Sequence, residues 1–339
     1  MPVLVTGATG FLGGHLVERL VEAGQSVRAL VRKQRTTWPW GAAPVETALG
    51  DVTQPASLAT AAAGCDVIYH LAARVSDWGP WSDFDAVTVQ GTENLLAAAV
   101  RAGCRRVVLV STAVVYDDRQ ARRLRRITES APLGTGDRAY GHYARAKVLA
   151  EDCARNYHTS GRVEVAILRP TWIYGPRDGT ILPRLLEHYE GRFACWIGRR
   201  DPCVDPIYVT DVADAVVLAG THAAAAGRAF NVSPDREIGL REFLGALFHE
   251  LAIRPPRLTV PYSVAWGATW ASETWSRLTR AREAPEMTWA GLACLTVDQH
   301  VDPTAIIRDL GWTPRVHLNT GARQTADWLR RASVPHEPT

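Results

Sequence analysis

Thr6-Gly7-Ala8-Thr9-Gly10-Phe11-Leu12-Gly13 is the stretch that decides the fold of this 339-residue chain. It follows a short apolar run that begins at Pro2, and a segment with helical spacing comes directly after it. In a strand–turn–helix of this kind Gly7 permits the tight turn, Gly10 lets the backbone approach a pyrophosphate, and Gly13 permits close packing of helix on strand. The positive N-terminus of the helix then holds the anion. The stretch therefore predicts a dinucleotide-binding loop.

Short apolar runs rich in Val and Ile alternate with helical segments up to about residue 170. This alternation is typical of βαβ units and a parallel sheet. We expect strands at 3–6, 26–31, 45–49, 67–70, 106–110 and 163–168. Helices are expected at 12–23, 56–63, 84–102 and 143–157. The predicted fold is α/β: a Rossmann-type, doubly wound parallel sheet with a smaller C-terminal α/β substrate-binding domain.

The character of the chain changes after Arg169-Pro170, where proline and tryptophan become more frequent and helical segments become shorter. We therefore expect an NAD(P)-binding Rossmann domain at 1–170 and a mainly substrate-binding domain at 171–335. The division is not expected to be clean, because 207–218 and 229–232 have the pattern of elements that return to the main sheet.

Composition and charge exclude several classes of protein. The net charge of +3 is small and no basic stripe is interleaved with aromatic residues, so nucleic acid is not expected as a partner. Six cysteines without a C-x-x-C pair indicate neither a disulfide framework nor a metal site, and we expect a cytoplasmic protein with reduced thiols. The chain opens on a strand-like segment without a signal-peptide pattern. The uncharged stretch 259–272 is shorter than the ~20 residues of a membrane span, so no transmembrane segment is expected, and a peripheral membrane contact stays open.

Arg32 stands where NAD-selective sites carry an acidic residue, at the end of the second expected strand. A carboxylate there repels a 2′-phosphate, whereas a guanidinium can grip one with two hydrogen bonds. Lys33 follows and adds a second cation. The pair favours NADP(H), with NAD(H) as the alternative cofactor. Asp51 and Val52, just after the third strand, are placed to flank the adenine.

Tyr143 and Lys147 begin a helical segment four residues apart, so their side chains share one helix face. A phenol with a pKa of ~10 is a poor acid or base at neutral pH, and a neighbouring ammonium together with the nicotinamide charge is expected to lower that pKa. Lysine is itself informative here, because the chain holds 38 Lys and Arg residues and only positions 33 and 147 are lysine. A hydroxyl from Ser111 or Thr112, at the end of the fifth strand, is expected to hold the substrate oxygen.

Together these motifs resemble the extended short-chain dehydrogenases/reductases of the NAD-dependent epimerase/dehydratase superfamily, and within them the 3β-hydroxysteroid dehydrogenase-like branch. The resemblance covers nearly the whole chain. It also rests on Asp66-Val-Ile-Tyr-His-Leu-Ala-Ala73, Gly91-Thr-Glu-Asn-Leu-Leu96, Leu168-Arg-Pro-Thr-Trp-Ile-Tyr-Gly-Pro176, Tyr208-Val-Thr-Asp211 and Leu310-Gly-Trp-Thr-Pro314. The branch is indicated by the loop 73–84, which is similar to that of steroid dehydrogenase-like and β-keto acid reductase-like members.

The resemblance implies that Thr112 and Tyr143 bond the reacting oxygen while Lys147 anchors the cofactor ribose. It implies cofactor contacts from Gly7, Thr9, Gly10, Phe11, Leu12, Gly13, Leu71, Ala72, Ala73, Pro170 and Thr171. The chain departs from the family pattern at Thr88, where the family usually has Asn. At position 112 the Thr keeps the hydroxyl of a Ser and adds a methyl group. A homodimer through the helices at 84–102 and 143–157 is also implied.

Trp172 takes the place of an Asn that contacts the diphosphate in sugar-nucleotide epimerases and dehydratases. An indole cannot replace that amide and offers a large apolar surface instead. The candidate substrate contacts are Trp78, Trp81, Ser111, Trp172 and Trp196. We therefore predict an NADP(H)-dependent oxidoreductase that interconverts a secondary alcohol and a ketone on a bulky hydrophobic substrate, such as a steroid, terpenoid, polyketide or β-keto acid. Two alternatives stay open: a sugar-nucleotide epimerase or dehydratase with tightly bound NAD(P), and a non-catalytic NADP-binding regulator.

Overall fold

The centre of the molecule is a parallel sheet, seen in a computed structural model that describes residues 1–117, 126–134, 140–191, 194–279, 281 and 283–332. Within these residues it has seven strands, and each pairs in parallel with its neighbours. From edge to edge they are β10 (Ala229–Val232), β6 (Glu164–Pro170), β5 (Arg106–Val110), β4 (Val67–His70), β1 (Val3–Thr6), β2 (Val27–Val31) and β3 (Val45–Leu49). The order reverses between β1 and β4, where doubly wound sheets bind ligands beyond the carboxyl ends of their strands. The predicted Rossmann-type α/β fold is confirmed.

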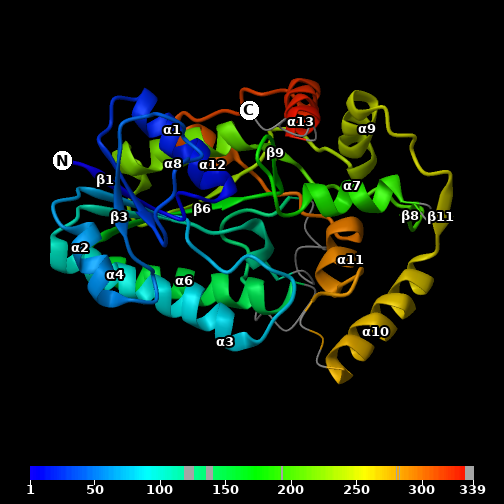
Figure 1. The fold of residues 1–339 in the computed structure, drawn as a ribbon, viewed down its shortest axis with the longest axis horizontal. Helices are drawn as coiled ribbons and strands as arrows, with labels where there is room; N and C mark the ends of the chain where they lie inside the picture. Colours follow the sequence, from blue (N-terminus) through cyan, green and yellow to red (C-terminus); the bar gives the residue numbers. More distant parts are fainter. Residues whose placement is uncertain (118–125, 135–139, 192–193, 280, 282, 333–339) are drawn as a thin grey trace.

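Alternation along the strands divides the core into two layers. Val3 and Val5 belong to one buried cluster and Leu4, between them, to the other, because successive side chains of a strand point to opposite faces. The helices that cover the two faces are α1 (Phe11–Glu22) and α8 (Val209–Thr221) on one side, and α2 (Pro55–Ala62), α4 (Gly91–Ala102) and α6 (Gly141–Thr159) on the other. Figure 1 shows α1 and α8 above the sheet and the other three below it.

The expected helix at 84–102 is three elements: α3 (Trp81–Phe84), the π-helical η1 (Asp85–Gln90) and α4. The prediction of one regular helix was wrong, because contacts at Thr88 hold a wider turn. The Thr88 hydroxyl accepts the Arg74 amide at 3.0 Å, and the Thr88 carbonyl accepts the Thr92 hydroxyl at 2.6 Å. Wider turns of this kind often occur at functional sites.

The chain after β6 contributes to the main sheet as well as to a separate group of elements. β10 pairs in parallel with β6, and α8 packs on α1, so parts of 207–232 lie with the sheet. The elements to the right of the sheet in Figure 1 are α7 (Leu182–Glu190), β8 (Cys195–Ile197), α9 (Leu240–Leu251), β11 (Leu258–Val260), α10 (Tyr262–Leu278) and α11 (Trp289–Thr296). The others are β7 (Ile173–Tyr174), β9 (Ile207–Tyr208), α12 (Thr304–Leu310) and α13 (Leu318–Ala332). The division into domains at residue 170 stays a prediction.

α10 has an unusual surface. It buries small and polar side chains, among them Thr269 and Glu273, and exposes Trp266, Trp270 and Trp275. Over the described part of the chain, none of the helices is both long enough and apolar enough to cross a bilayer.

Candidate active site

The glycine loop follows β1 and is shaped by close backbone contacts. Gly7 has a φ of 70°, in the left-handed region that favours glycine, and its carbonyl accepts the Gly10 amide at 2.9 Å. A Cβ at Gly13 would lie 2.1 Å from the Gly7 oxygen, so a larger residue would push α1 away from the loop. Gly10 is exposed and carries no side chain to cap α1, which leaves the first amides of the helix available to an anion.

The segment after β4 lies against this loop. Leu71 donates its amide to the Thr6 carbonyl at 3.2 Å, and Ala72 donates to Thr6 Oγ1 at 3.3 Å. A Cβ at Gly7 would come within 2.8 Å of the Ala72 nitrogen. The structure therefore brings together two of the predicted cofactor segments, 7–13 and 71–73, at the point where the strand order reverses.

His70 joins the same region, although the sequence analysis gave it no role of its own. Its Nδ1 lies 2.7 Å from Thr6 Oγ1 and its Nε2 lies 3.0 Å from Thr92 Oγ1. Burial, together with the charge of Lys147, lowers the pKa of His70 to about 3. The imidazole is therefore neutral at pH 7 and links β1, β4 and α4 through hydrogen bonds. The sequence feature that could have indicated this role is the histidine that ends the otherwise apolar run 67–70.

Arg32 and Lys33 follow β2 and are both exposed. After β3, Asp51 Oδ1 accepts the amide and the hydroxyl of Thr53 at 2.9 and 2.8 Å, while Val52 is 5% exposed. These four predicted cofactor residues follow the carboxyl ends of two neighbouring strands, at the same sheet edge as the glycine loop. The positive charges at this end of the predicted cofactor site are therefore carried by the exposed side chains of Arg32 and Lys33.

Thr112, Tyr143 and Lys147 come together where β5 ends. The Thr112 side chain forms a hydrogen bond with the Tyr143 side chain. Tyr143 and Lys147 are one helical turn apart near the start of α6, and Lys147 is 4% exposed. The ammonium of Lys147 donates to the carbonyl of Val110, the last residue of β5, at 2.8 Å. This bond holds the ammonium at the carboxyl edge of the sheet.

Burial dominates the proton affinity of both groups on α6. It raises the pKa of Tyr143 to about 12, and the Thr112 hydrogen bond opposes this only in part. It lowers the pKa of Lys147 to about 8, opposed by the charge of Glu151. The expected lowering of the tyrosine pKa by the ammonium and the nicotinamide charge is not found in the protein itself, because burial is the larger effect. Tyr143 is therefore a protonated phenol at pH 7.

A buried ion pair lies one turn beyond Lys147. Glu151 and Arg169 are 0% and 1% exposed, and they are joined by bonds of 3.0 Å (Nε to Oε1) and 2.6 Å (Nη2 to Oε2). Burial alone would raise the pKa of Glu151, but the bonds and charge of Arg169 outweigh it and lower that pKa. The nearby Ser111 side chain acts in the same direction. Ser111 is thus placed at the ion pair, whereas Thr112 is placed at Tyr143.

Glu151 was not predicted as part of this site. Its position in the sequence could have indicated it. Glu151 lies one turn after Lys147, on the helix face that also carries Tyr143. Its partner Arg169 lies on β6, so only the fold could show that the two charges meet.

The turn after β6 is held from two sides. Pro170 is the last residue of β6, which neighbours β5 in the sheet. Thr171 is 5% exposed; its amide donates to the Val232 carbonyl at 3.0 Å and its hydroxyl to the Asp205 carbonyl at 2.6 Å. The predicted cofactor contacts Pro170 and Thr171 therefore sit on a fixed backbone.

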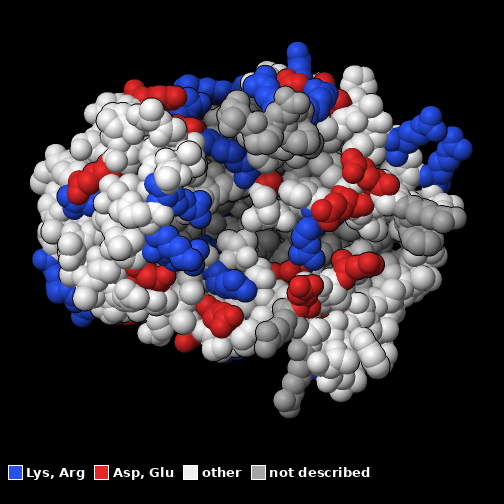
Figure 2. Space-filling model, in the orientation of Figure 1, with Lys and Arg blue, Asp and Glu red and all other residues white. Residues whose placement is uncertain are grey.

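One of the candidate substrate tryptophans, Trp81, lies beside the catalytic group. The ring of Trp81 meets that of His142, the residue before Tyr143, at 5.6 Å. Trp78 donates from Nε1 to the carbonyl of Ala281 at 3.1 Å, which joins the loop after β4 to the segment after α10. Figure 2 shows a hollow at the centre of the face drawn, rimmed by charged side chains.

The other two belong to the hydrophobic core. Trp172 is 8% exposed and its ring stands edge-on to Phe243 at 5.5 Å. Trp196 is partly buried against Tyr189 and Phe248. Each of these two indoles packs among other aromatic rings, so the structure does not bring them to Tyr143 in the way that it brings Trp81.

Residues 3–233 match the sequence profile described as the NAD dependent epimerase/dehydratase family. This range holds the glycine loop, the seven strands and all of Thr112, Tyr143 and Lys147. The chain belongs to the NAD-dependent epimerase/dehydratase family. The cradle fits the family's cofactor, because the loop and α1 present uncapped backbone amides where a pyrophosphate is held.

Several curated relatives of the chain are named as reductases or dehydrogenases. The chain is 30% identical to the 4-hydroxy-2-methyl-3-oxo-4-farnesyl-3,4-dihydroquinoline-1-oxide ketoreductase of Stigmatella aurantiaca, over 99% of both proteins. It is 30% identical to the 3 beta-hydroxysteroid dehydrogenase/Delta 5-->4-isomerase of Mycobacterium tuberculosis, over 92% of this chain and 86% of the relative. A crystal structure of gox2253 superposes with a TM-score of 0.81 at 24% identity over 98% of each chain, which supports the fold. The predicted membership of the extended short-chain dehydrogenases/reductases, with 3β-hydroxysteroid dehydrogenase-like relatives, is confirmed, and the chain is an NAD-dependent enzyme of that type.

Proposed function

We propose that this enzyme uses NADP(H) to interconvert a secondary alcohol and a ketone on a bulky hydrophobic substrate. The observation that carries the proposal is the meeting of Thr112, Tyr143 and Lys147 at the carboxyl end of β5. The glycine loop lies at the same edge of the sheet, two strands away. A substrate oxygen near Tyr143 and a dinucleotide on the loop therefore share one edge.

Each of the three side chains has a separate task in the proposed reaction. When bound, NADP(H) supplies or accepts the hydride at C4 of its nicotinamide. The hydroxyls of Thr112 and Tyr143 hold the substrate oxygen, and Tyr143 gives its proton to that oxygen during reduction or takes one during oxidation. At pH 7 Tyr143 carries the proton that it would give to a ketone during reduction. Lys147 holds the cofactor ribose, and its charge favours the phenolate after proton transfer.

The substrate class is inferred from the apolar residues and from the names of the relatives. Trp172 packs in the core and leaves no amide where sugar-nucleotide enzymes carry an Asn. Trp81 lies next to the helix turn that carries Tyr143. One relative is a ketoreductase of a farnesylated quinoline and another acts on a 3β-hydroxysteroid, as their names state. A steroid, terpenoid, polyketide or β-keto acid-like molecule is the substrate that these observations support.

The preference for NADP(H) over NAD(H) is inferred from Arg32 and Lys33. Both are exposed and follow β2, at the position where the ribose 2′ group of a dinucleotide lies in this fold. Two cations attract a 2′-phosphate and offer no acceptor to a 2′-hydroxyl.

The proposal is tested with a panel of steroid, terpenoid and β-keto acid substrates, each assayed with NADPH, NADH and the oxidised cofactors. We expect a stoichiometric change in reduced-nicotinamide absorbance. Tyr143→Phe is expected to lower kcat by roughly 10²–10⁴-fold, the usual contribution of a general acid. The matched control is Tyr157→Phe on the same helix, whose hydroxyl bonds Glu93 at 2.7 Å. Full activity in Tyr143→Phe would show that the mechanism is wrong.

A sugar-nucleotide epimerase or dehydratase is the second candidate, because the matching profile is named for those activities. Such an enzyme turns over a nucleotide sugar with no net change in nicotinamide absorbance, so the same panel, extended by nucleotide sugars, separates the two. A non-catalytic NADP-binding regulator would turn over neither, and it would have no use for three converging catalytic groups.

The assembly and location of the enzyme stay predictions. We propose a homodimer through the outer faces of α4 and α6, which light scattering of the purified protein would test. We also propose that the enzyme is cytoplasmic, which fractionation of its cells would test.

A further inference from the structure

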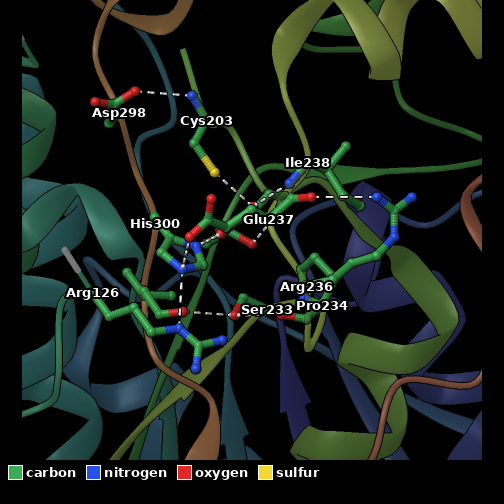
Figure 3. Close-up of polar contacts among 12 residues, drawn as sticks. Arg126, Cys203, Ser233, Pro234, Arg236, Glu237, Ile238, Asp298 and His300 are labelled. Atoms are coloured by element: carbon green, nitrogen blue, oxygen red, sulfur yellow. Dashed lines mark hydrogen bonds and ion pairs between the residues drawn. The ribbon is translucent and has the colours of Figure 1, made fainter. Parts of the chain in front are cut away.

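A thiol and a carboxylate from one segment meet an imidazole from another segment next to Thr171. The Cys203 sulfur, an Asp205 oxygen and a ring nitrogen of His300 lie within 4.8 Å of one another. The Cys203 thiol donates to Asp205 Oδ1 at 2.9 Å, and His300 Nδ1 is bonded to Asp205 Oδ2. Figure 3 shows the Cys203 thiol and the His300 ring approaching one another from two different segments of the chain.

We propose that Cys203, Asp205 and His300 form a binding site for one divalent cation of the zinc type. Sulfur, imidazole nitrogen and carboxylate oxygen are the three ligand types that Zn²⁺ takes in proteins. Asp205 is 0% and His300 6% exposed, while Cys203 is half-buried and gives access from solvent. A thiolate, a carboxylate and a neutral imidazole together balance the two positive charges of the ion, which suits a buried site.

The spacing of the three donor atoms is close to that of a coordination sphere. With Zn–S of ~2.3 Å and Zn–N and Zn–O of ~2.0 Å, tetrahedral ligand atoms stand roughly 3.3–3.5 Å apart. In this structure the Cys203 sulfur lies 2.9 Å from Asp205 Oδ1, and the three donor atoms all lie within 4.8 Å of one another. The separation expected for bound ligands falls within this range. Small side-chain rotations are therefore enough to admit the ion.

Binding requires two changes of protonation. The Cys203 proton leaves to solvent when the ion takes its place on sulfur. The His300 proton moves from Nδ1 to Nε2, where Glu237 Oε1 lies 3.4 Å away and can accept it. Arg126, which donates to Nε2 at 3.0 Å in the metal-free protein, then turns toward Asp302, 3.9 Å from its guanidinium.

The backbone around the cluster is already arranged for such a site. Asp205 has a φ of 41°, in the left-handed region that a non-glycine residue rarely adopts and that occurs at functional sites. Its Oδ1 accepts the Ile238 amide at 2.9 Å, and Asp298 Oδ1 accepts the Cys203 amide at 2.9 Å. The ligands are thereby oriented by second contacts, as in known metal sites.

The site would join segments that lie far apart in the sequence to the turn after β6. The Asp205 carbonyl accepts the Thr171 hydroxyl, and the His300 carbonyl accepts the Ile127 amide at 3.0 Å. A bound ion is therefore expected to stabilise the structure around Thr171 rather than to take part in hydride transfer.

The test uses the full, tag-free chain after dialysis against a chelator. Titration with Co²⁺ is expected to give a sulfur-to-cobalt charge-transfer band that saturates at one equivalent. Zn²⁺ at a hundredfold excess over its Kd should abolish the band and raise the Tm by roughly 5 °C. Cys203→Ser is expected to lose the band, and His300→Gln to weaken Co²⁺ binding at least tenfold.

The matched control is Cys153→Ser. Its thiol also donates to a carboxylate, Glu93 at 2.7 Å, but the third member of that group is the Tyr157 hydroxyl. The control should keep the full cobalt band. Absence of the band in the wild-type chain, or its persistence in Cys203→Ser, would overturn the proposal. Because the wild-type titration needs no variant, it decides the question even where a variant does not fold.

Discussion

The two ends of the predicted dinucleotide site are built in different ways. The first, which we call the catalytic end, includes the glycine loop as well as the catalytic group. There, Gly13 packs against Gly7, while His70 and Lys147 form hydrogen bonds with residues of neighbouring strands. At the selectivity end, Arg32 and Lys33 are exposed after β2. The first end depends on packing and desolvation, whereas the second depends on charges that face water.

This difference teaches where large effects are to be expected. A buried polar group that loses its partner costs several kcal/mol, because nothing replaces the lost interaction. An exposed charge is screened by water and salt and contributes less. Substitutions at the catalytic end should therefore change folding or binding strongly, and those at the selectivity end should mainly change the choice of cofactor.

The largest effect is expected at the buried ion pair. Glu151→Gln leaves the Arg169 guanidinium, 1% exposed, without its counter-charge, which should lower the free energy of unfolding by about 3–5 kcal/mol. Urea unfolding measures it. The control is Glu242→Gln, whose side chain is 48% exposed in its pair with Arg236 and should change stability by less than about 1 kcal/mol. Equal losses in the two variants would break the comparison.

Next in size is the glycine loop. A Cβ at Gly13 would lie 2.1 Å from the Gly7 oxygen, so Gly13→Ala must displace α1 and should weaken dinucleotide binding at least about 100-fold, or ~2.7 kcal/mol. Calorimetric titration with NADPH measures it. Gly245→Ala, in α9 with nothing within 4 Å of the new Cβ, is the helical control and should leave binding unchanged. Wild-type affinity in Gly13→Ala would show that the loop is not the cradle.

A pH dependence of stability follows from His70. Its folded pKa of about 3 lies below the unfolded value near 6.5, so between these values the unfolded chain binds the extra proton and stability is lost as the pH falls. From pH 6.5 to pH 5 the loss should be roughly 2 kcal/mol. His70→Gln cannot take up that proton and should show a shallower fall, measured by urea midpoints at each pH. Parallel slopes in the two proteins would mean that His70 is not held neutral.

The smallest effect is expected at Arg32. Arg32→Asp places a carboxylate beside the 2′ position and should shift the ratio of kcat/KM for NADPH and NADH by about tenfold toward NADH, or ~1.4 kcal/mol. The wild-type preference should also weaken with added salt, as expected for an exposed charge. Arg35→Asp, also exposed and three residues on, is the charge-matched control. An unchanged ratio would discard the assignment of Arg32, and a loss larger than that of Gly13→Ala would reverse the comparison.

Much of the fold could be predicted, because its signals are local. The glycine loop, the six strands expected before residue 170 and the pair Tyr143 and Lys147 each depend on spacing within a few residues. β6, observed at Glu164–Pro170 against an expected 163–168, shows how small the errors in the strand bounds are.

The features that were missed depend on contacts between distant residues. The π-helical turn at Thr88 is held by the amide of Arg74, and Glu151 meets Arg169 only because α6 packs on β6. Periodicity does not report such pairs. The same holds for Trp172, whose burial against Phe243 in α9 follows from the packing of two separate segments. The raised pKa of Tyr143 likewise reflects burial, which no i, i+4 spacing encodes.

The scarcity of lysine has a practical consequence for labelling chemistry. Lys147 is 4% exposed, so Lys33 is the side-chain amine that an amine-reactive reagent can reach, on a surface where the other cations are guanidinium groups. Among the side chains, a fluorophore attached through an amide bond would therefore go to one defined position, beside the selectivity end. Its emission could report dinucleotide binding without any engineered cysteine, and protection of Lys33 by NADPH could be followed by peptide mass alone.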